Sequence, residues 1–375
     1  MPATRPPAIL QVLPALVSGG VERGTLEIAE ALVAAGHRAL VASAGGPLVG
    51  PLERLGARHV TLPLRGKNPV ALWRNAAALA ALIRAEGVGI IHARSRAPAW
   101  SALLAARRTG AHFVTTYHGT YNEGLPGKRL YNSVMARGER VIAISRFIAD
   151  HIRARHGTDP GRIRVIPRGV DPRRFDPAQV APARIAALRA EWRVPEGRQA
   201  VMLPGRLTRW KGQTVLLEAM ARLPGDALVL LVGAGSGGFR QELAARAAAL
   251  GLGDRVRLCG HTEDMPAALL LADLVVHAST DPEAFGRTVI EAQAMARPVI
   301  AADLGAPRET VEEGVTGWRV PPGDPGALAA AIAAALALPP AARQALGDRA
   351  RAHVLARYTT QAMQEATLAV YRELA

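Results

Sequence analysis

Short apolar runs alternate with longer amphipathic stretches along the first half of the chain. Five apolar runs predict buried strands, at residues 9–13, 39–43, 90–91, 113–116 and 141–144. Four amphipathic stretches between them predict helices, at residues 22–35, 69–86, 97–108 and 146–155. Repeated strand–helix alternation is typical of a parallel sheet covered by helices, so we expect a doubly wound α/β domain here.

The same alternation starts again in the second half. Residues 163–172 are expected to end the first sheet, and a linking helix is expected after Pro177. Strand-like runs then follow at residues 200–205, 228–232, 256–258, 274–276 and 298–301, and the last stretch, about 358–374, is expected to be helical. A chain of 375 residues is long enough for two such domains, which we expect to divide near residue 175. Ligands of doubly wound sheets bind at the carboxyl ends of the strands, and two such domains that face each other would have these ends on one cleft.

Two carboxylates surround a predicted helix start in the second half. Glu283 follows the strand-like run 274–279, and Glu291 lies about one turn inside the helix that continues through 292–296. The backbone N–H groups of residues 286–289 would be the unpaired donors of that helix start, which can bind an anion. The helix start could thus offer N–H groups to a diphosphate and carboxylates to sugar hydroxyls. A plainer alternative is a loop carboxylate and a Glu that the helix dipole favours.

A basic turn follows the first strand of the second half, in Gly205-Arg-Leu-Thr-Arg-Trp-Lys-Gly212. Arg206 and Lys211 are five residues apart across this turn, so both cations can point at one diphosphate. Lys211 is also the only lysine after residue 175. The alternative is a solvated basic turn, and Arg209 between the two is expected to be exposed.

Glycines follow two of the predicted strands. Gly19 and Gly20 come after the first strand, where they let the backbone approach a phosphate. The run Gly233-Ala-Gly235-Ser-Gly-Gly238 matches the dinucleotide fingerprint Gly-x-Gly-x-x-Gly. That fingerprint requires an acidic residue at the end of the next strand, and 258–261 contains none. We therefore reject a nicotinamide site.

Together these motifs resemble those of the family-4 retaining glycosyltransferases. Those enzymes have Glu-x7-Glu around Glu-x-Phe-Gly, and Gly-Arg-Leu-x-x-x-Lys-Gly, and the likeness extends from Ile9 to about Asp324. It also includes Pro167-x-Gly-Val-Asp171 and Thr316-Gly-Trp-x-Val320. The resemblance implies the GT-B fold, two facing Rossmann-like domains with a deep cleft. It also implies an acceptor-binding domain at 1–175, completed by a terminal helix at about 358–375, and a donor-binding domain at 176–357.

The resemblance also implies roles for individual residues. Glu291 would bind the ribose hydroxyls, Glu283 and His118 would contact the transferred sugar, and Arg206 and Lys211 would neutralise the leaving diphosphate. The other residues implied in donor binding are Gly19, Gly20, Gly205, Gly233, Gly235, His261, Thr262, Met265, Phe285, Gly286, Arg287 and Thr288. The implied reaction is retaining hexosyl transfer from a UDP- or GDP-sugar to a glycan or glycolipid, without a metal ion or cofactor.

Two departures and one local likeness refine this interpretation. The family commonly has a Gly before the Pro region, where this chain has Met295-Ala-Arg297-Pro. The family usually has a hydrophobic residue after Phe-Gly, where this chain has Arg287. The Arg287 side chain could reach the phosphates or point to solvent. The stretch 92–100 resembles a subgroup associated with lipopolysaccharide core and surface-polysaccharide assembly.

The formal net charge of +15 lies entirely in the first half. Residues 1–175 contain 25 Lys and Arg against 10 Asp and Glu, whereas the remainder has 21 of each. Such charge favours an anionic partner, either a membrane surface, a phosphorylated lipid or nucleic acid. Aromatic residues, at 4%, are too few for base-stacking platforms, so we expect a membrane surface and no nucleic acid. A biased composition rich in Arg is the alternative explanation.

Other features of the composition concern location and rival functions. The single Cys259 excludes a disulfide framework, and Pro6, Pro7 and Pro14 argue against a signal peptide. We therefore expect a cytoplasmic protein that is peripheral on the inner face of the membrane. The lack of an Asp-x-Asp pair disfavours the metal-dependent sugar transferases. The rival functions are a sugar-nucleotide epimerase or a glycan phosphorylase-like enzyme of the same fold, and a non-enzymatic basic protein that binds membranes or nucleic acid. The sequence does not predict the oligomeric state.

Overall fold

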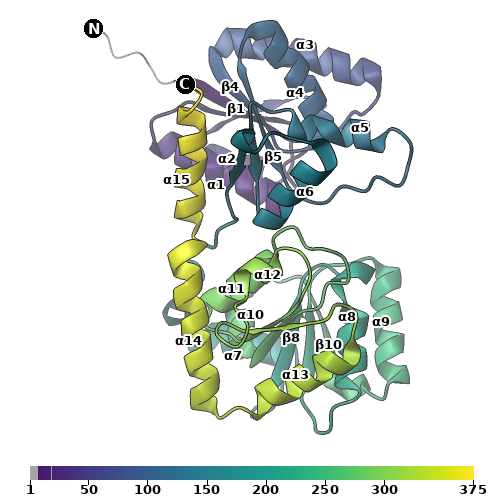
Figure 1. The fold of residues 1–375 in the computed structure, drawn as a ribbon. Helices are drawn as coiled ribbons and strands as arrows, with labels where there is room; N and C mark the ends of the chain where they lie inside the picture. The colour runs from purple at the N-terminus through teal and green to yellow at the C-terminus, as the bar shows by residue number, and fades with distance from the viewer. Residues whose placement is uncertain (1–6, 18) are drawn as a thin grey trace. The chain divides into compact units, whose positions relative to one another are not determined.

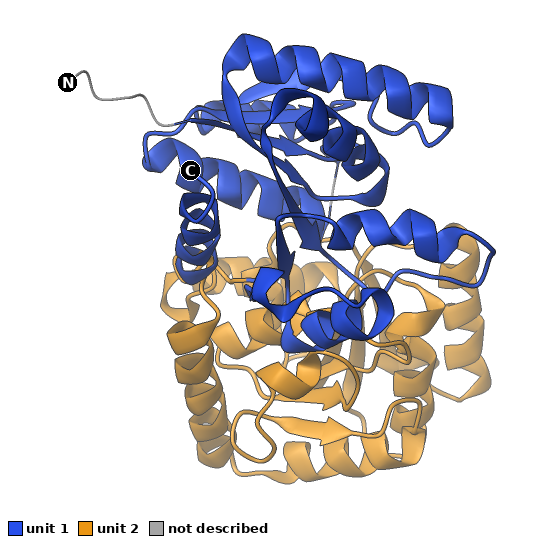
Figure 2. Cartoon of the chain, turned by 45° about the horizontal axis from the view of Figure 1, so that its top comes forward, with its two compact units in different colours: residues 1–168, 361–375 blue, residues 169–360 orange. Residues whose placement is uncertain are grey.

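The computed structural model describes residues 7–17 and 19–375, so Pro6 and Ser18 lie outside the described residues. The chain divides into two compact units, shown in Figure 2: residues 1–168 with 361–375, and residues 169–360. The first division falls after residue 168, whereas the sequence analysis placed it after residue 175. At the boundary, Val170 exchanges backbone hydrogen bonds with 358–360: its N–H donates to Tyr358 and its carbonyl accepts from Thr360, both at 2.9 Å. These two hydrogen bonds join the segment around Val170 to residues 358–360, and both segments belong to the second unit.

The sheet of the first unit has the strand order β3-β2-β1-β4-β5-β6-β7 among the described residues, with every pair parallel. Figure 1 labels its strands β1, β4 and β5. Its strands are β1 Ala8–Val12, β2 Ala39–Ser43, β3 Arg58–Thr61, β4 Val88–Ala93, β5 His112–Tyr117, β6 Arg140–Ala143 and β7 Ile163–Val165. Central strands covered on both faces have nearly continuous apolar sequences, which is why most were predictable. The sequence prediction missed β3, an edge strand of exposed and half-buried residues.

Helices cover both faces of this sheet. They are α1 Gly20–Ala34, α2 Val49–Arg54, α3 Pro69–Glu86, α4 Arg96–Thr109, α5 Lys128–Asn132, α6 Arg146–His156 and α15 Thr360–Arg372. Side chains of α1, α2 and α15 share one core cluster with β1, whereas α3 packs against α4. Gln364 of α15 donates a hydrogen bond to the Glu27 carbonyl of α1 at 2.7 Å, so the C-terminal helix forms part of the first unit.

The second unit contains a second parallel sheet, in the order β10-β9-β8-β11-β12-β13 among the described residues. The strands are β8 Ala200–Pro204, β9 Leu228–Val232, β10 Val256–Gly260, β11 Leu274–His277, β12 Val299–Ala302 and β13 Trp318–Val320. The helices are α7 Pro182–Glu191, α8 Gln213–Met220, α9 Gly237–Ala249, α10 Met265–Leu271, α11 Arg287–Ala294, α12 Pro307–Thr310, α13 Pro325–Ala337 and α14 Pro340–Arg357. The predicted pair of doubly wound α/β domains is confirmed.

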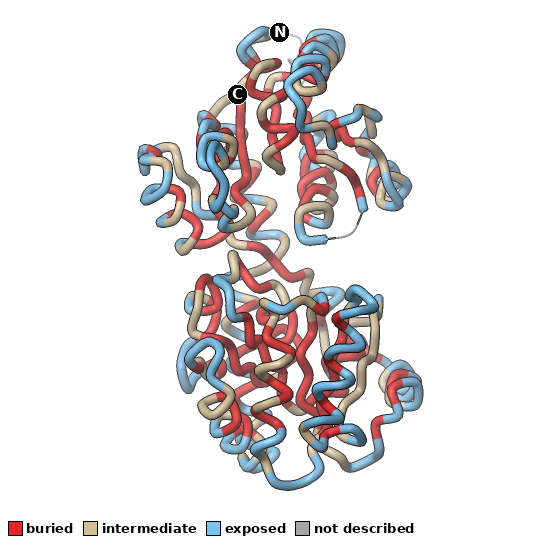
Figure 3. Tube along the Cα trace, turned by 90° about the vertical axis from the view of Figure 1, so that its right-hand side faces the viewer, coloured by how far each residue is buried: buried red, intermediate tan, exposed pale blue. Residues whose placement is uncertain are grey.

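Each unit has its own apolar core. Figure 3 shows the buried residues gathered in the interior of each unit. In the second unit, α8, α9 and α13 pack their apolar side chains on one face of the sheet. Within the described residues, no single helix is long and apolar enough to cross a membrane, and α13 with α14 meets that criterion only as a pair bent by 111°.

Candidate functional site

The predicted donor-binding motifs lie at the switch point of the second sheet. Strands β8 and β11 are neighbours at the centre, and the chain extends outward from them in opposite directions, to β9 and β10 on one side and β12 and β13 on the other. Loops that leave the carboxyl ends of two such strands diverge and leave a crevice, where doubly wound sheets bind ligands. Lys211 lies in the loop after β8, and Glu283 lies in the loop after β11.

These two loops bring Lys211 and Glu283 into contact. The Lys211 ammonium donates a hydrogen bond to Glu283 Oε2, and the two side chains are only 15% and 16% exposed. The ammonium also lies 4.3 Å from the centre of the Trp210 ring. Sequence analysis assigned the lysine to a diphosphate and the glutamate to a sugar, but in this structure they pair with each other.

A histidine that the sequence analysis did not single out completes this cluster. His277, the last residue of β11, places Nε2 3.4 Å from Glu283 Oε2 and 3.3 Å from Ser279 Oγ. Burial alone would raise the pKa of Glu283, but the hydrogen bond from His277 and the charge of Lys211 lower that pKa to about 2. Glu283 is therefore an ionised, oriented acceptor for hydroxyl groups at neutral pH.

Two glycines allow this close packing of loops. Gly212 has a left-handed φ of 75°, and a Cβ on it would overlap the Ala278 carbonyl. The Thr280 N–H donates to the Trp210 carbonyl at 2.8 Å, which joins the same two loops. Gly286, with φ 82°, is the N-cap residue of α11 and leaves space beside Glu283. Only glycine adopts such conformations without strain.

The first turns of α11 carry the second predicted carboxylate. Glu291 is the fifth residue of α11 and is 8% exposed, and Arg287 Nε lies 3.6 Å from its Oε1. The Arg287 side chain is therefore directed toward Glu291. Thr288 is half-buried, whereas Phe285 is buried with its ring 6.0 Å from that of Tyr358.

The other predicted cation, Arg206, is exposed. Its carbonyl accepts a hydrogen bond from Gln213 at 3.0 Å, but within residues 7–17 and 19–375 its guanidinium has no hydrogen bond or ion pair. By contrast, Arg209 in the same turn binds Glu242 through two hydrogen bonds of 2.6 and 2.7 Å. Among the residues that the structure describes, Arg206 is therefore a cation that no carboxylate pairs with.

The predicted glycine turns lie side by side. The Gly205 N–H donates to the Val232 carbonyl at 2.8 Å, and Gly235 forms an isolated parallel β-bridge with Leu207. A Cβ on Gly233 would overlap the Gly205 carbonyl. The close approach of these two loops is therefore enough to explain why glycine stands at positions 233 and 235. A bound dinucleotide is not needed to explain the Gly-x-Gly pattern.

The loop after β10 contains the residues predicted to hold the nucleotide base. His261 is exposed, Thr262 Oγ1 accepts from the Asp264 N–H at 3.1 Å, and Met265 begins α10. Asp264 also caps this helix and binds Arg184, so its loop is firmly held.

The remaining predicted residues belong to the first unit. Gly19 and Gly20 begin α1, and His118 follows β5. His118 Nδ1 lies 2.5 Å from Nη2 of Arg168, which is 5% exposed. Burial, followed by the charges of Arg168 and Arg94, holds the pKa of His118 well below its ordinary value. Arg168 is the variable position of Pro167-x-Gly-Val-Asp171, so this motif could have drawn attention to it.

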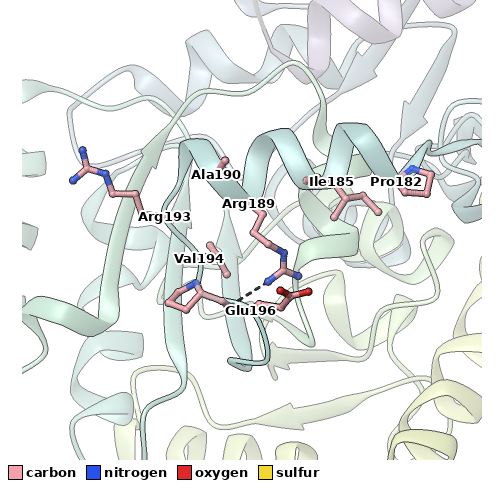
Figure 4. A pocket seen from close by; sticks show the side chains of 9 residues that line it. Pro182, Ile185, Arg189, Ala190, Arg193, Val194 and Glu196 are labelled. Atoms are coloured by element: carbon pink, nitrogen blue, oxygen red, sulfur yellow. Dashed lines mark hydrogen bonds between the residues drawn. The ribbon is translucent and has the colours of Figure 1, made fainter.

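Two cavities differ in their relation to these motifs. One of about 660 Å³ lies along α7 (Figure 4), and its polar groups include Arg189 and Glu196, with Arg193 directed away. None of the predicted site residues lines it. The other, of about 430 Å³ in the first unit, is lined by three cations, Arg65, Lys67 and Arg96, together with Glu22 and neutral residues that include Ser95 and Tyr131.

Comparison with known proteins identifies the family. The profile of Glycosyltransferase Family 4 matches residues 18–174, and that of Glycosyl transferases group 1 matches residues 185–353. A glycosyltransferase from Rickettsia africae ESF-5 is 37% identical, with 98% of each chain covered and a TM-score of 0.91. HepE of Anabaena, solved in complex with UDP-glucose, is 25% identical, covering 98% of this chain and 99% of that one, with a TM-score of 0.85.

A curated relative matches over a smaller region. The D-inositol 3-phosphate glycosyltransferase of Segniliparus rotundus is 34% identical over 268 residues, which are 69% of this chain and 58% of that protein. The chain thus spans little more than half the length of this relative. Together the profile matches and the Rickettsia structure establish that this chain belongs to the family-4 glycosyltransferases and has their GT-B fold.

Proposed function

We propose that the protein is a retaining hexosyltransferase that uses a UDP- or GDP-sugar. The observation that carries this proposal is the cluster of Lys211, Glu283 and His277 at the sheet's switch point, next to the turn that contains the uncompensated Arg206. An ionised carboxylate fixed by two neighbours is suited to binding sugar hydroxyls, and cations from the adjacent strand are suited to a diphosphate. The UDP-glucose complex of the Anabaena protein supports this class of donor.

In the proposed reaction, the charge of the two cations is used as the sugar–phosphate bond breaks. Negative charge grows on the leaving diphosphate, and Arg206 and Lys211 would stabilise it, a contribution that is often the largest in catalysis. The acceptor oxygen would attack from the same face of the sugar, and a diphosphate oxygen would take its proton. Glu291 would bind the ribose, and His118 would contact the transferred sugar. The reaction would need no metal ion or cofactor.

We place the acceptor in the cationic cavity of the first unit and propose that it is a glycan or glycolipid of lipopolysaccharide or surface-polysaccharide assembly. Lys67 lines that cavity, and Val70 and Trp73, which follow it on α3, are 61% and 60% exposed. Leu130, which precedes the cavity residue Tyr131, is 63% exposed. Apolar side chains among cations suit the surface of an anionic membrane. The protein would therefore be cytoplasmic and peripheral on the inner membrane face.

Donor binding tests the function most directly. A thermal-shift panel of UDP- and GDP-sugars should raise the melting temperature with one nucleotide, because a ligand of the folded state stabilises it. Radiolabelled sugar from that donor should then be consumed only when an acceptor is present, with the anomeric configuration retained. Consumption without acceptor would favour an epimerase, and no shift with any donor would contradict the proposal.

Vesicle binding tests the membrane proposal separately. Wild-type protein should sediment with anionic vesicles, less so at high salt, and Trp73→Ser should weaken this binding. Val315→Ser is the matched control, because Val315 is also exposed, at 46%, but lies in the second unit. Equal binding to neutral vesicles, or equal losses in both variants, would contradict this surface.

A further inference from the structure

The contact between Arg168 and His118 determines which ring nitrogen of the histidine carries the proton. Arg168 Nη2 lies 2.5 Å from His118 Nδ1. A guanidinium can only donate hydrogen bonds, so Nδ1 must accept with its lone pair. A neutral imidazole has one N–H group, which in His118 must therefore be on Nε2.

We propose that Arg168 is a positioning residue that holds His118 as the neutral Nε2–H tautomer, so that this N–H donates a hydrogen bond to an oxygen of the transferred sugar. The tautomer follows from the contact alone, whereas the sugar oxygen rests on the proposed function. His118 Nε2 is buried and, within the part of the chain that the structure describes, has no hydrogen-bond partner. A buried N–H without a partner is costly, and a ligand oxygen would satisfy it.

The surroundings of His118 oppose a second proton on its ring. Burial has the largest effect and the charges of Arg168 and Arg94 add to it, so the pKa of His118 is well below its ordinary value. His92 is also held neutral, between Thr116 and Tyr371. The neighbouring Tyr121 hydroxyl accepts from the His118 backbone N–H at 3.4 Å. His118 is thus suited to donate a hydrogen bond and unsuited to serve as an acid near neutral pH.

Two helices border the Arg168 guanidinium, and the neighbouring Arg94 is bound to β1. Met363 of α15 has its sulfur 3.8 Å from Nη1, and Arg94 donates to Gln11 of β1 at 2.9 Å. In α1, a Cβ on Gly24 would lie 2.5 Å from Arg168 Nη1 and 2.9 Å from Arg94 Nη2. A side chain at Gly24 would therefore have to displace both guanidinium groups, whose atoms would be its nearest neighbours.

The tautomer can be measured directly by nitrogen NMR of the full-length protein labelled with ¹⁵N-histidine, with His118→Asn to assign the signals. In the wild type, Nδ1 should be unprotonated and Nε2 protonated, and the ring should stay neutral at neutral pH. In Arg168→Met the histidine should become a mixture of tautomers, and Arg168→Lys, which keeps a donor, should restore part of the wild-type spectrum. Gly24→Ala should shift the same signals while retaining both arginines.

Activity provides the second measurement. Arg168→Met should lower kcat roughly tenfold, as expected for one misdirected hydrogen bond, with partial recovery in Arg168→Lys. The matched control is Arg107→Met, since Arg107 is an exposed arginine in the last turn of α4. A wild-type Nδ1–H tautomer, or a wild-type spectrum in Arg168→Met, would overturn the proposal. Unchanged kcat in a variant with an altered tautomer would overturn its role in transfer. If the wild type transferred no sugar, the proposed function would fail. The NMR spectra would still show whether Arg168 fixes the tautomer of His118.

Discussion

Lys211 and Glu283, 72 residues apart in sequence, form an ion pair between the loops that follow the neighbouring strands β8 and β11. Because Glu283 is ionised, its charge cancels that of Lys211 before any ligand binds. A diphosphate would then compete with Glu283 for the ammonium, whereas Arg206 can bind it without such competition. In the proposed reaction, the pair would couple the binding of the leaving diphosphate to the binding of the sugar.

Removing the charge of Glu283 should separate two effects of this carboxylate: its competition with the diphosphate for Lys211, and its binding of sugar hydroxyls. Glu283→Gln keeps the size of the side chain but leaves the charge of Lys211 uncompensated, so we expect UDP or GDP to bind roughly tenfold more tightly, about 1.4 kcal/mol. The turnover of the nucleotide sugar should fall, because the amide holds hydroxyls less strongly than a carboxylate. Calorimetry with the nucleotide and steady-state kinetics measure the two quantities. Weaker nucleotide binding in the variant would show that the pair does not oppose the diphosphate.

The same carboxylate should contribute to the pH dependence of stability. Its pKa is about 2 in the folded protein against an ordinary value of 4.5, so its contribution is fully present above pH 4.5 and is lost as the pH falls toward 2. At neutral pH, Glu283→Gln should lower the free energy of unfolding by on the order of 3 kcal/mol. This difference should shrink steadily in urea titrations below pH 4.5. A difference that stays constant down to pH 2 would mean that the ionised carboxylate does not stabilise the fold.

Arg206 should matter for the chemical step and little for folding, because it is exposed and its guanidinium has no partner among the described residues. Arg206→Ala should lower kcat by roughly 10² to 10³, the usual effect of losing one group that stabilises transition-state charge. Arg209→Ala, in the same turn but bound to Glu242, is the matched control and should retain turnover. Similar losses in the two variants would point to a general effect of charge in place of a role for Arg206.

Transfer should not depend on a metal ion, because Arg206 and Lys211 would supply the positive charge that a divalent cation provides elsewhere. Initial rates with the nucleotide sugar should therefore be the same in EDTA and in Mg²⁺. The assay must use protein passed through a chelating resin. A loss of activity in EDTA that Mg²⁺ or Mn²⁺ restores would contradict the proposed metal-independent reaction.

Local patterns predicted most of the sheets and the loops that carry the motifs. The strands are apolar because helices cover both faces, and Glu283 and Glu291 were placed by the strand and helix around them. The ion pair of Lys211 with Glu283 was not predictable in this way, since it depends on β8 and β11 being neighbours. His277 and Arg168 were missed for a related reason. Each acts through a contact in space, and the Arg168–His118 contact joins residues 50 apart.

The role of Glu291 can be tested by removing a hydroxyl from the ligand and, separately, the charge from the protein, and then comparing the two effects. If Glu291 accepts hydrogen bonds from the ribose, wild-type protein should bind a 2′-deoxynucleoside diphosphate about tenfold more weakly than the ribonucleotide, the effect of one charged hydrogen bond. Glu291→Gln should weaken binding of the ribonucleotide and remove most of this discrimination, because the two changes delete the same contact. Arg287→Met is the companion variant, since Arg287 lies 3.6 Å from the Glu291 carboxylate and helps to hold it. Discrimination that persists undiminished in Glu291→Gln would show that Glu291 does not contact the ribose hydroxyl that was removed.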